Sequence, residues 1–181
     1  MKKMKRTASA IILLLMLFLS ACTATAGGTS EKDPFEMLKG PLTLSGTLAV
    51  GEREYGMRLT TPDGKTAKVE FLSPESMQGY VFEKAEDGFF ISYGDLRVPL
   101  KSGVLPGGAG VLLSLWEMDP AAIQKSETKA NGMDLTVYTL PLGADGEMRI
   151  FLKKADNTPL RVEFDSRLGS GIFHISEVKY E

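Results

Sequence analysis

Residues 147–180, EMRIFLKKADNTPLRVEFDSRLGSGIFHISEVKY, carry the pattern that decides the fold class. Alternate positions are apolar in two runs, Met148, Ile150 and Leu152 in the first and Leu160, Val162 and Phe164 in the second. A period of two is typical of β-strands with one dry and one solvated face. Asp, Asn, Gly and Ser separate the runs and predict an antiparallel meander. Phe151, and Tyr138 upstream, are expected to interrupt the polar outer face.

The same theme extends upstream to residue 42. TPDGK at residues 61–65, Asp87-Gly88 and Asn131-Gly132 are turn sequences that favour tight hairpins. This spacing predicts antiparallel strands rather than βαβ units, roughly ten in all. The expected strands are a first run from residue 42 to 50, then 55–60, 66–72, 80–84, 89–93, 123–129, 133–140, 147–153, 160–165 and 172–180.

Two segments have helical patterns. Within Leu105 to Met118, four apolar residues fall at i, i+1, i+4 and i+5, which predicts one largely buried helix that ends at Asp119-Pro120. These residues are Val111, Leu112, Leu115 and Trp116. Residues 33–39 fit a short helix with Asp33 as N-cap and Pro34 at its first position.

The glycine-rich segment PGGAG, residues 106–110, leaves two interpretations open. It is either a hinge that lets the following helix move or a tight connection where the backbone packs closely. A phosphate-binding loop is disfavoured, because the Gly-Lys-Ser/Thr ending and a parallel βαβ context are missing.

The expected sheet is wider than the expected helix. Ten strands spaced by about 4.8 Å span about 45 Å, whereas a helix is about 10 to 12 Å across and covers two or three strands. The rest of the apolar face must be closed by curvature, loops, a lipid or another protein, because large exposed apolar patches are uncommon. We therefore predict a mostly β (α+β) fold in which the helix covers only part of the apolar face of the sheet.

The N-terminus has the pattern of an export signal. Four positive charges in residues 1–6 precede an apolar run, residues 8–19, that is shorter than the roughly 20 residues needed to span a bilayer. The following LSAC, which ends at Cys22, resembles the lipobox of bacterial lipoproteins, in which this cysteine receives a diacylglyceryl group and becomes the mature N-terminus. An uncleaved signal anchor with an incidental cysteine is the alternative.

These features divide the chain into three parts. We expect a signal peptide at residues 1–21, a flexible tether at 22–33 and one domain at 34–181. The mature protein would be anchored to the cell membrane through lipidated Cys22, on the extracytoplasmic face.

Composition excludes several functions. Without residues 1–21 the chain has 17 basic and 23 acidic residues, a net charge of −6, so nucleic-acid binding is not expected. Cys22 is the only cysteine and His174 the only histidine, and no G-x-S-x-G motif is present. We expect His174 at a sheet edge or rim, with Ser176 on the same face, and predict no enzyme activity, metal or cofactor.

Several short motifs resemble the LolA/LolB-like lipoprotein-carrier superfamily. They are Phe71-Leu-Ser-Pro74, Gly79-Tyr-Val-Phe82, Gly88, Tyr93-Gly-Asp-Leu96, Pro99-Leu100 and Leu105-Pro106, followed by the apolar helix. The resemblance covers roughly residues 42–180. It implies an unclosed half-barrel wrapped around a helix, with acyl chains or other hydrophobic ligands on the concave face. LolA-type carriers are soluble, whereas this chain has a lipoprotein signal. LppX-like carriers and the clostridial spore germination lipoprotein are similar in layout, and the latter works through a protein partner.

The sequence thus predicts a membrane-anchored, non-catalytic lipoprotein that binds an acyl or other hydrophobic ligand between sheet and helix. The expected lining residues are Leu112, Leu115, Trp116, Met148, Ile150, Val162 and Phe164. The alternative is an interaction module that docks a protein partner, or a second copy as a homodimer, through the sheet.

Overall fold

The computed structural model describes residues 40–63, 65–100, 108–115, 119–143, 146–167 and 169–180, all within the unit Asp33–Glu181. The expected signal peptide, the tether with Cys22, the helix at 33–39, and both Trp116 and Met118 lie outside these ranges. Within the described part of the chain, no helix has the length and apolar character needed to cross a membrane.

Eleven strands and two short helices make up the described structure. In chain order they are β1 (Leu42–Val50), β2 (Arg53–Thr61), β3 (Ala67–Ser73), β4 (Tyr80–Ala85), β5 (Gly88–Tyr93), β6 (Leu96–Leu100), α3 (Ala109–Ser114), the 3-10 helix η4 (Pro120–Ala122), β7 (Gln124–Ala130), β8 (Met133–Pro141), β9 (Glu147–Lys153), β10 (Pro159–Ser166) and β11 (Gly169–Tyr180).

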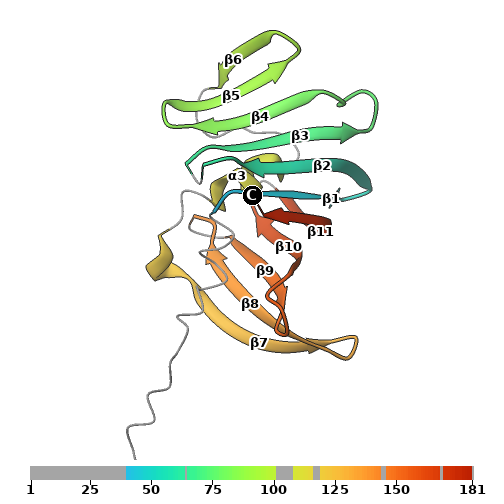
Figure 1. The fold of residues 1–181 in the computed structure, drawn as a ribbon, viewed down its shortest axis with the longest axis vertical. Helices are drawn as coiled ribbons and strands as arrows, with labels where there is room; N and C mark the ends of the chain where they lie inside the picture. Colours follow the sequence, from blue (N-terminus) through green and yellow to red (C-terminus); the bar gives the residue numbers. More distant parts are fainter. Residues whose placement is uncertain are drawn as a thin grey trace, which may run out of the picture. The chain divides into compact units, whose positions relative to one another are not determined.

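All eleven strands form one antiparallel sheet in the order β6-β5-β4-β3-β2-β1-β11-β10-β9-β8-β7. Strands β1–β6, here the N-terminal arm, and β7–β11, the C-terminal arm, are each a meander, and β1 pairs with β11 where they meet. The edge strands β6 and β7 lie at opposite ends of the sheet (Figure 1). The predicted mostly β, unclosed half-barrel is therefore confirmed.

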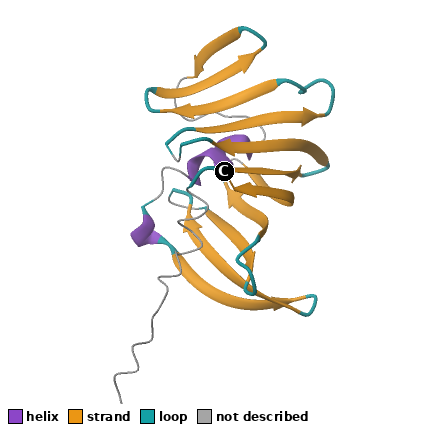
Figure 2. Ribbon diagram, viewed as in Figure 1, coloured by secondary structure: helices purple, strands orange, loops and turns teal. Residues whose placement is uncertain are grey.

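Helix α3 packs against β3 and β4, so it covers about as many strands as its width allows. Strands make up most of the described chain, and its helices are short (Figure 2). Its residues Ala109, Leu112 and Leu113 are fully buried, which confirms that one buried helix lies against the sheet. The described helix is shorter than the predicted 105–118. It begins at Ala109 because Gly108 has φ 77°, a left-handed conformation outside the helix.

The predicted alternation holds in β9, where Met148, Ile150 and Leu152 are buried on the concave face. In β10 the prediction for Leu160 is wrong. The register shifts between Pro159 and Arg161, so Leu160 packs on the opposite, convex face with Phe151. A bulge of this kind inserts one extra residue and reverses the side on which earlier residues lie.

The expectation for Tyr138 is also wrong, whereas that for Phe151 is confirmed. Tyr138 pairs with Ile150 and is 2% exposed in the concave core. Phe151 forms a small convex cluster with Leu135 and Val137. In β8 the apolar residues lie on both faces, so the strand lacks the simple alternation that assigns a side from sequence.

The turn predicted at Asn131-Gly132 is confirmed. Both residues have positive φ, 50° and 78°, as a two-residue hairpin between paired Ala130 and Met133 requires.

Candidate functional site

The predicted lining residues come together in one hydrophobic cluster on the concave face. Six of the seven are described, and all six are at most 7% exposed: Leu112, Leu115, Met148, Ile150, Val162 and Phe164. Trp116 lies outside the described residues. The set is therefore contiguous, and in this structure its described members form the core.

Close packing holds the start of α3 against this core. A Cβ atom added to Gly108 would lie 2.7 Å from Cζ of Phe164 and 3.2 Å from Cδ2 of Leu48. A Cβ atom on Gly171 would lie 2.6 Å from the same Cζ atom of Phe164. Of the two interpretations of the glycine-rich segment, the geometry at Gly108 favours a tight connection.

The β5–β6 hairpin presents a different concave face, and we call its six concave side chains the hairpin patch. They are Phe89, Ile91 and Tyr93 on β5 and Leu96, Val98 and Leu100 on β6. The register places them beside the core, because Ile91 pairs with buried Phe82 and Val98 pairs with Ile91. None of the six is charged.

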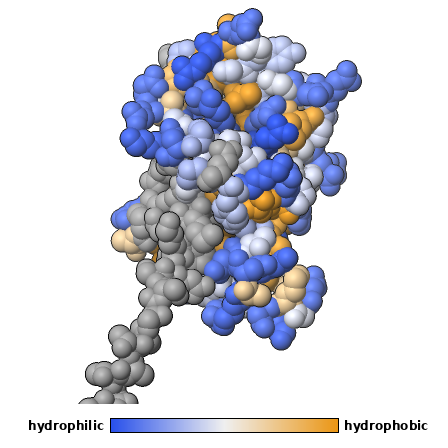
Figure 3. Space-filling model, in the orientation of Figure 1, coloured by the Kyte–Doolittle hydropathy of each residue, from blue (hydrophilic) through white to orange (hydrophobic). Residues whose placement is uncertain are grey.

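Exposure within the hairpin patch increases toward the turn at Gly94-Asp95. Phe89, Ile91 and Leu100 are half-buried, whereas Tyr93 is 55%, Leu96 65% and Val98 40% exposed. The Tyr93 ring lies against that of Tyr80, with centroids 4.8 Å apart. Apolar side chains also reach the surface among hydrophilic ones over the strands at the top of Figure 3. Apolar surface thus runs from the core to the end of the hairpin.

The sequence prediction missed β6 and with it half of the hairpin patch. The signal was present, because LRVPL at residues 96–100 alternates apolar and other residues directly after the Gly94-Asp95 turn. Pro99 obscured it, since proline disfavours a central strand but is tolerated on an edge strand. In the structure β6 is that edge.

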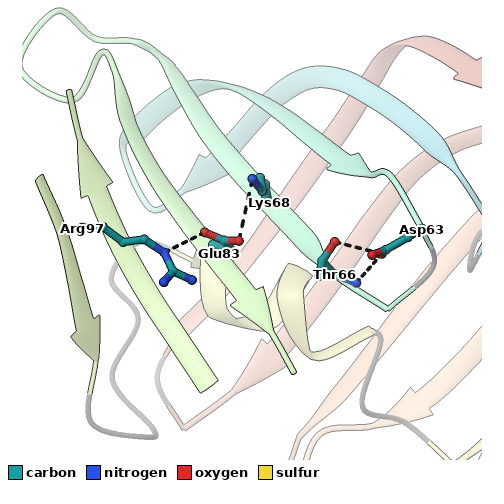
Figure 4. Close-up of polar contacts among 5 residues, drawn as sticks. All are labelled: Asp63, Thr66, Lys68, Glu83 and Arg97. Atoms are coloured by element: carbon teal, nitrogen blue, oxygen red, sulfur yellow. Dashed lines mark hydrogen bonds and ion pairs between the residues drawn. The ribbon is translucent and has the colours of Figure 1, made fainter. Parts of the chain in front are cut away.

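Glu83, Lys68 and Arg97 of the N-terminal arm lie on the convex face, whereas Lys84 of β4 pairs with Phe89 and with buried Ala67 and so lies on the concave face. Glu83 pairs with Lys68 of β3, at 3.7 Å, and with Arg97 of β6, at 3.3 Å (Figure 4). The Arg97 guanidinium also stacks on Phe90, 3.4 Å from the ring centroid. Arg97, the charged residue of β5 and β6, therefore lies on the convex face, opposite the hairpin patch.

The C-terminal arm has a matching convex arrangement. Glu163 pairs with Arg149, at 3.1 Å, and with Arg161, at 2.7 Å, and Arg161 lies 4.1 Å from the centroid of Phe151. These side chains are partly solvated, so each ion pair contributes little to stability. The arms differ chiefly on their concave faces.

The two free edges are both protected against pairing with another strand. Strand β7 is almost entirely exposed and carries Lys125, Glu127 and Lys129. In β6 the two-residue turn makes Tyr93 and Leu96 the first hydrogen-bonded pair, so Arg97 and Pro99 direct their backbone groups to the open edge. Pro99 has no N–H to donate. Such features disfavour strand addition.

His174 is exposed in β11, where it pairs with Thr47 of β1 and Arg161 of β10. The predicted edge position is therefore wrong, because β11 lies in the middle of the sheet. The Ser176 hydroxyl donates to the carbonyl oxygen of Ser45 at 3.1 Å. Among the described residues, no group of three or more His, Cys, Asp or Glu side chains could hold a metal ion.

No protein-family model matches the chain, and no curated protein sequence matches it. Similar solved structures include an uncharacterized conserved protein from Thermus thermophilus, with 18% identity, TM-score 0.52, and coverage of 81% of this chain and 82% of the other. At this identity the likeness shows a shared fold only.

Two other similar structures carry descriptive names. A LolA superfamily protein from Nitrosomonas europaea has 11% identity and TM-score 0.44, with 82% of this chain and 92% of the other covered. A putative outer membrane lipoprotein-sorting protein domain from Vibrio parahaemolyticus has 15% identity and TM-score 0.47, with 81% and 92% covered. Both TM-scores are below 0.5, so these two likenesses add no conclusion about the family or role of this chain; the predicted unclosed half-barrel is shown by its own sheet topology.

Proposed function

We propose that this chain is a lipid-anchored, non-catalytic lipoprotein of the bacterial cell envelope that binds an acyl chain or similar apolar ligand on the concave face of its half-barrel. The anchor would be the diacylglyceryl group on Cys22. The signal pattern at residues 1–22 supports the anchor.

One observation carries the ligand-binding part of the proposal: the concave apolar face continues past the strands that α3 covers. Helix α3 packs on β3 and β4, and the hairpin patch on β5 and β6 lies beyond it. Tyr93, Leu96 and Val98 stay 40% to 65% exposed at its outer end. Continuous apolar surface that leads from solvent into a core is typical of a site for an apolar ligand.

The ligand would lie along β5 and β6, with its inner end directed toward α3. There it would approach Leu112 and Leu115. Contact with the deeper residues Met148, Ile150, Val162 and Phe164 would require the helix to leave the close packing of Gly108 against Phe164. Trp116 is proposed to belong to the same lining. None of the six side chains of the hairpin patch is charged, which favours an alkyl chain there. Lys84 of β4, which pairs with Phe89, lies beside the inner end of the patch.

Docking of a protein partner, or of a second copy, is the alternative function. The free edges β6 and β7 are the observation in its favour. Pro99 on β6 and the charges on β7 weigh against it, because they hinder the pairing of an added strand.

The test is titration of a delipidated Cys22→Ala chain with a fluorescent fatty acid. We expect saturable binding that Val98→Asp weakens at least tenfold. The matched control is Met133→Asp, since Met133 is 43% exposed against 40% for Val98 but lies outside the hairpin patch. Absence of saturable binding, or equal binding by the Val98→Asp variant, would refute the proposal. Circular dichroism verifies that each variant is folded.

A further inference from the structure

We infer that the outer end of the hairpin patch, formed by Tyr93, Leu96 and Val98, is a membrane contact that rests on the lipid bilayer holding the anchor. This inference extends the proposed function: it assigns the bilayer surface as the partner of these three residues. The residues that carry it are the most exposed part of the hairpin patch.

The chemistry of the three side chains fits a lipid interface. Leu96 and Val98 supply alkyl surface, and Tyr93 combines an apolar ring with a hydroxyl, which suits the boundary between headgroups and acyl chains. Leu96, 65% exposed, directly follows the Gly94-Asp95 turn, so the apolar side chains lie beside the protruding end of the hairpin. Asp95 is the acidic residue in that turn.

The tether brings the domain within reach of the membrane. Seventeen residues, 23–39, lie between Cys22 and Gly40, the first described residue. Fully extended they span at most about 60 Å. Attachment at this length keeps the hairpin at a high effective concentration near the bilayer, so a small contact is sufficient for association.

The size of the exposed end argues against a second copy as its occupant. Three partly exposed side chains present on the order of 300 Å² of apolar surface, within the range that a monomer carries. A stable protein interface buries about 800 Å² on each partner. A bilayer contact, helped by the tether, has no such requirement.

Charge predicts which lipids favour the contact. On the concave face, no side chain of β5 or β6 is charged, and Lys84 of β4 lies beside Phe89, at the other end of the patch from Leu96. Glu83, Lys68 and Arg97 lie on the convex side. The mature chain, with 17 basic and 23 acidic residues, is repelled by anionic surfaces. The contact should therefore form on zwitterionic phosphatidylcholine vesicles, tolerate salt, and weaken when anionic lipid is added.

The experiment places an environment-sensitive label on the full lipidated chain, reconstituted in phosphatidylcholine vesicles. Lipidation consumes the thiol of Cys22, so NBD attached to a Leu96→Cys variant is the only thiol label. We expect its emission to rise several-fold relative to the Cys22→Ala, Leu96→Cys chain without vesicles, and to be quenched by doxyl-labelled lipid. A Met133→Cys label, also at an exposed apolar residue but outside the hairpin patch, should stay accessible to aqueous iodide.

Equal iodide access at residues 96 and 133 on vesicles would overturn the inference. NBD emission on vesicles equal to that of the vesicle-free chain would overturn it too. A Val98→Cys label provides a second position with the same expectation. The two hypotheses fail separately, because acyl binding is measured without vesicles and the contact with them. Fatty-acid binding together with a water-exposed label at residue 96 would refute only the membrane contact. A bilayer-embedded label without fatty-acid binding would refute only the ligand site.

Discussion

Strands β9 and β10 bury their concave side chains, whereas β5 and β6 leave part of theirs in water. Ile150 of β9 is 1% exposed and Val162 of β10 is 2% exposed, while Leu96 of β6 is 65% exposed. Both arms are apolar on this face, so composition does not explain the difference. The two regions differ in their contacts with α3: its start packs on Phe164 of β10, whereas β5 and β6 lie beyond β3 and β4, the strands that the helix contacts.

The concave apolar face of one sheet is thus buried in one region and partly exposed in another. In the C-terminal arm it supplies core packing, which stabilises the fold. In the hairpin patch the same residue types are left partly exposed, and our proposal assigns this surface to an apolar ligand. Variants placed at equivalent concave positions can separate these uses.

The largest effect is expected for Ile150→Glu. Ile150 is 1% exposed, so the new carboxylate would be buried in the core without a partner. The free energy of unfolding should fall by several kcal/mol. Against a total stability of roughly 5 to 15 kcal/mol, this would unfold much of the protein. Urea denaturation followed by circular dichroism measures it. Val98→Glu is the control, and a change within about 0.5 kcal/mol is expected there; equal losses would abolish the distinction between the arms.

A smaller loss is expected for Gly108→Ala. The new methyl group would meet the Phe164 ring at 2.7 Å, and the φ of 77° is unfavourable for alanine, so we expect a loss of about 2 to 4 kcal/mol. Gly132→Ala is the matched control, because Gly132 has φ 78° but no atom within 4 Å of an added Cβ. It should lose only about 1 kcal/mol. Equal thermal shifts for both would mean that the helix start is not packed against the C-terminal arm.

The smallest effect concerns Asp63, in the turn between β2 and β3. Hydrogen bonds from the backbone N–H groups of Thr66, at 2.7 Å, and Lys65, at 2.9 Å, together with the Thr66 hydroxyl, lower the pKa of this carboxyl below its ordinary value of 3.8. The ionised form therefore stabilises the folded state above that value, and the stabilisation is lost as the pH falls through the lowered pKa.

Asp63→Ala should reduce the melting temperature slightly at pH 7 and progressively less below pH 4, as scanning calorimetry across this range can measure. The matched position in the C-terminal arm is Asp156, whose pKa is also lowered, chiefly by the backbone N–H of Thr158. Asp156→Ala should show the same sign of pH dependence. A loss that grows on acidification at either site would contradict the assigned cause and show that the arms differ at their turns.

Much of the fold could be predicted from local sequence. Alternation assigned Met148 and Ile150 to the dry face, and Asn131-Gly132 gave its hairpin, because these signals depend on neighbours in the chain. Leu160 was misassigned because a bulge reverses the face within a strand, which no alternation pattern contains. Pro99 concealed β6, since edge position depends on the whole sheet order.

An apolar candidate site could be predicted from the sequence, but its exposed part on β5 and β6 could not. An apolar face wider than one helix follows from strand count and helix width. Which strands stay uncovered depends on where α3 packs, and this is fixed by tertiary contacts such as Gly108 against Phe164. The sequence prediction therefore selected the best-patterned strands, β9 and β10, whose concave residues form the core.

Native mass spectrometry of the Cys22→Ala chain, purified without delipidation, tests the central claim most directly. We expect a monomer that carries the added mass of an acyl lipid. The Met133→Asp variant of the same chain should carry the same lipid. The Val98→Asp monomer should be folded and free of lipid. Three results would contradict ligand binding at the β5–β6 hairpin: a Cys22→Ala monomer without lipid, a dimer, or equal retention of lipid by the Val98→Asp variant.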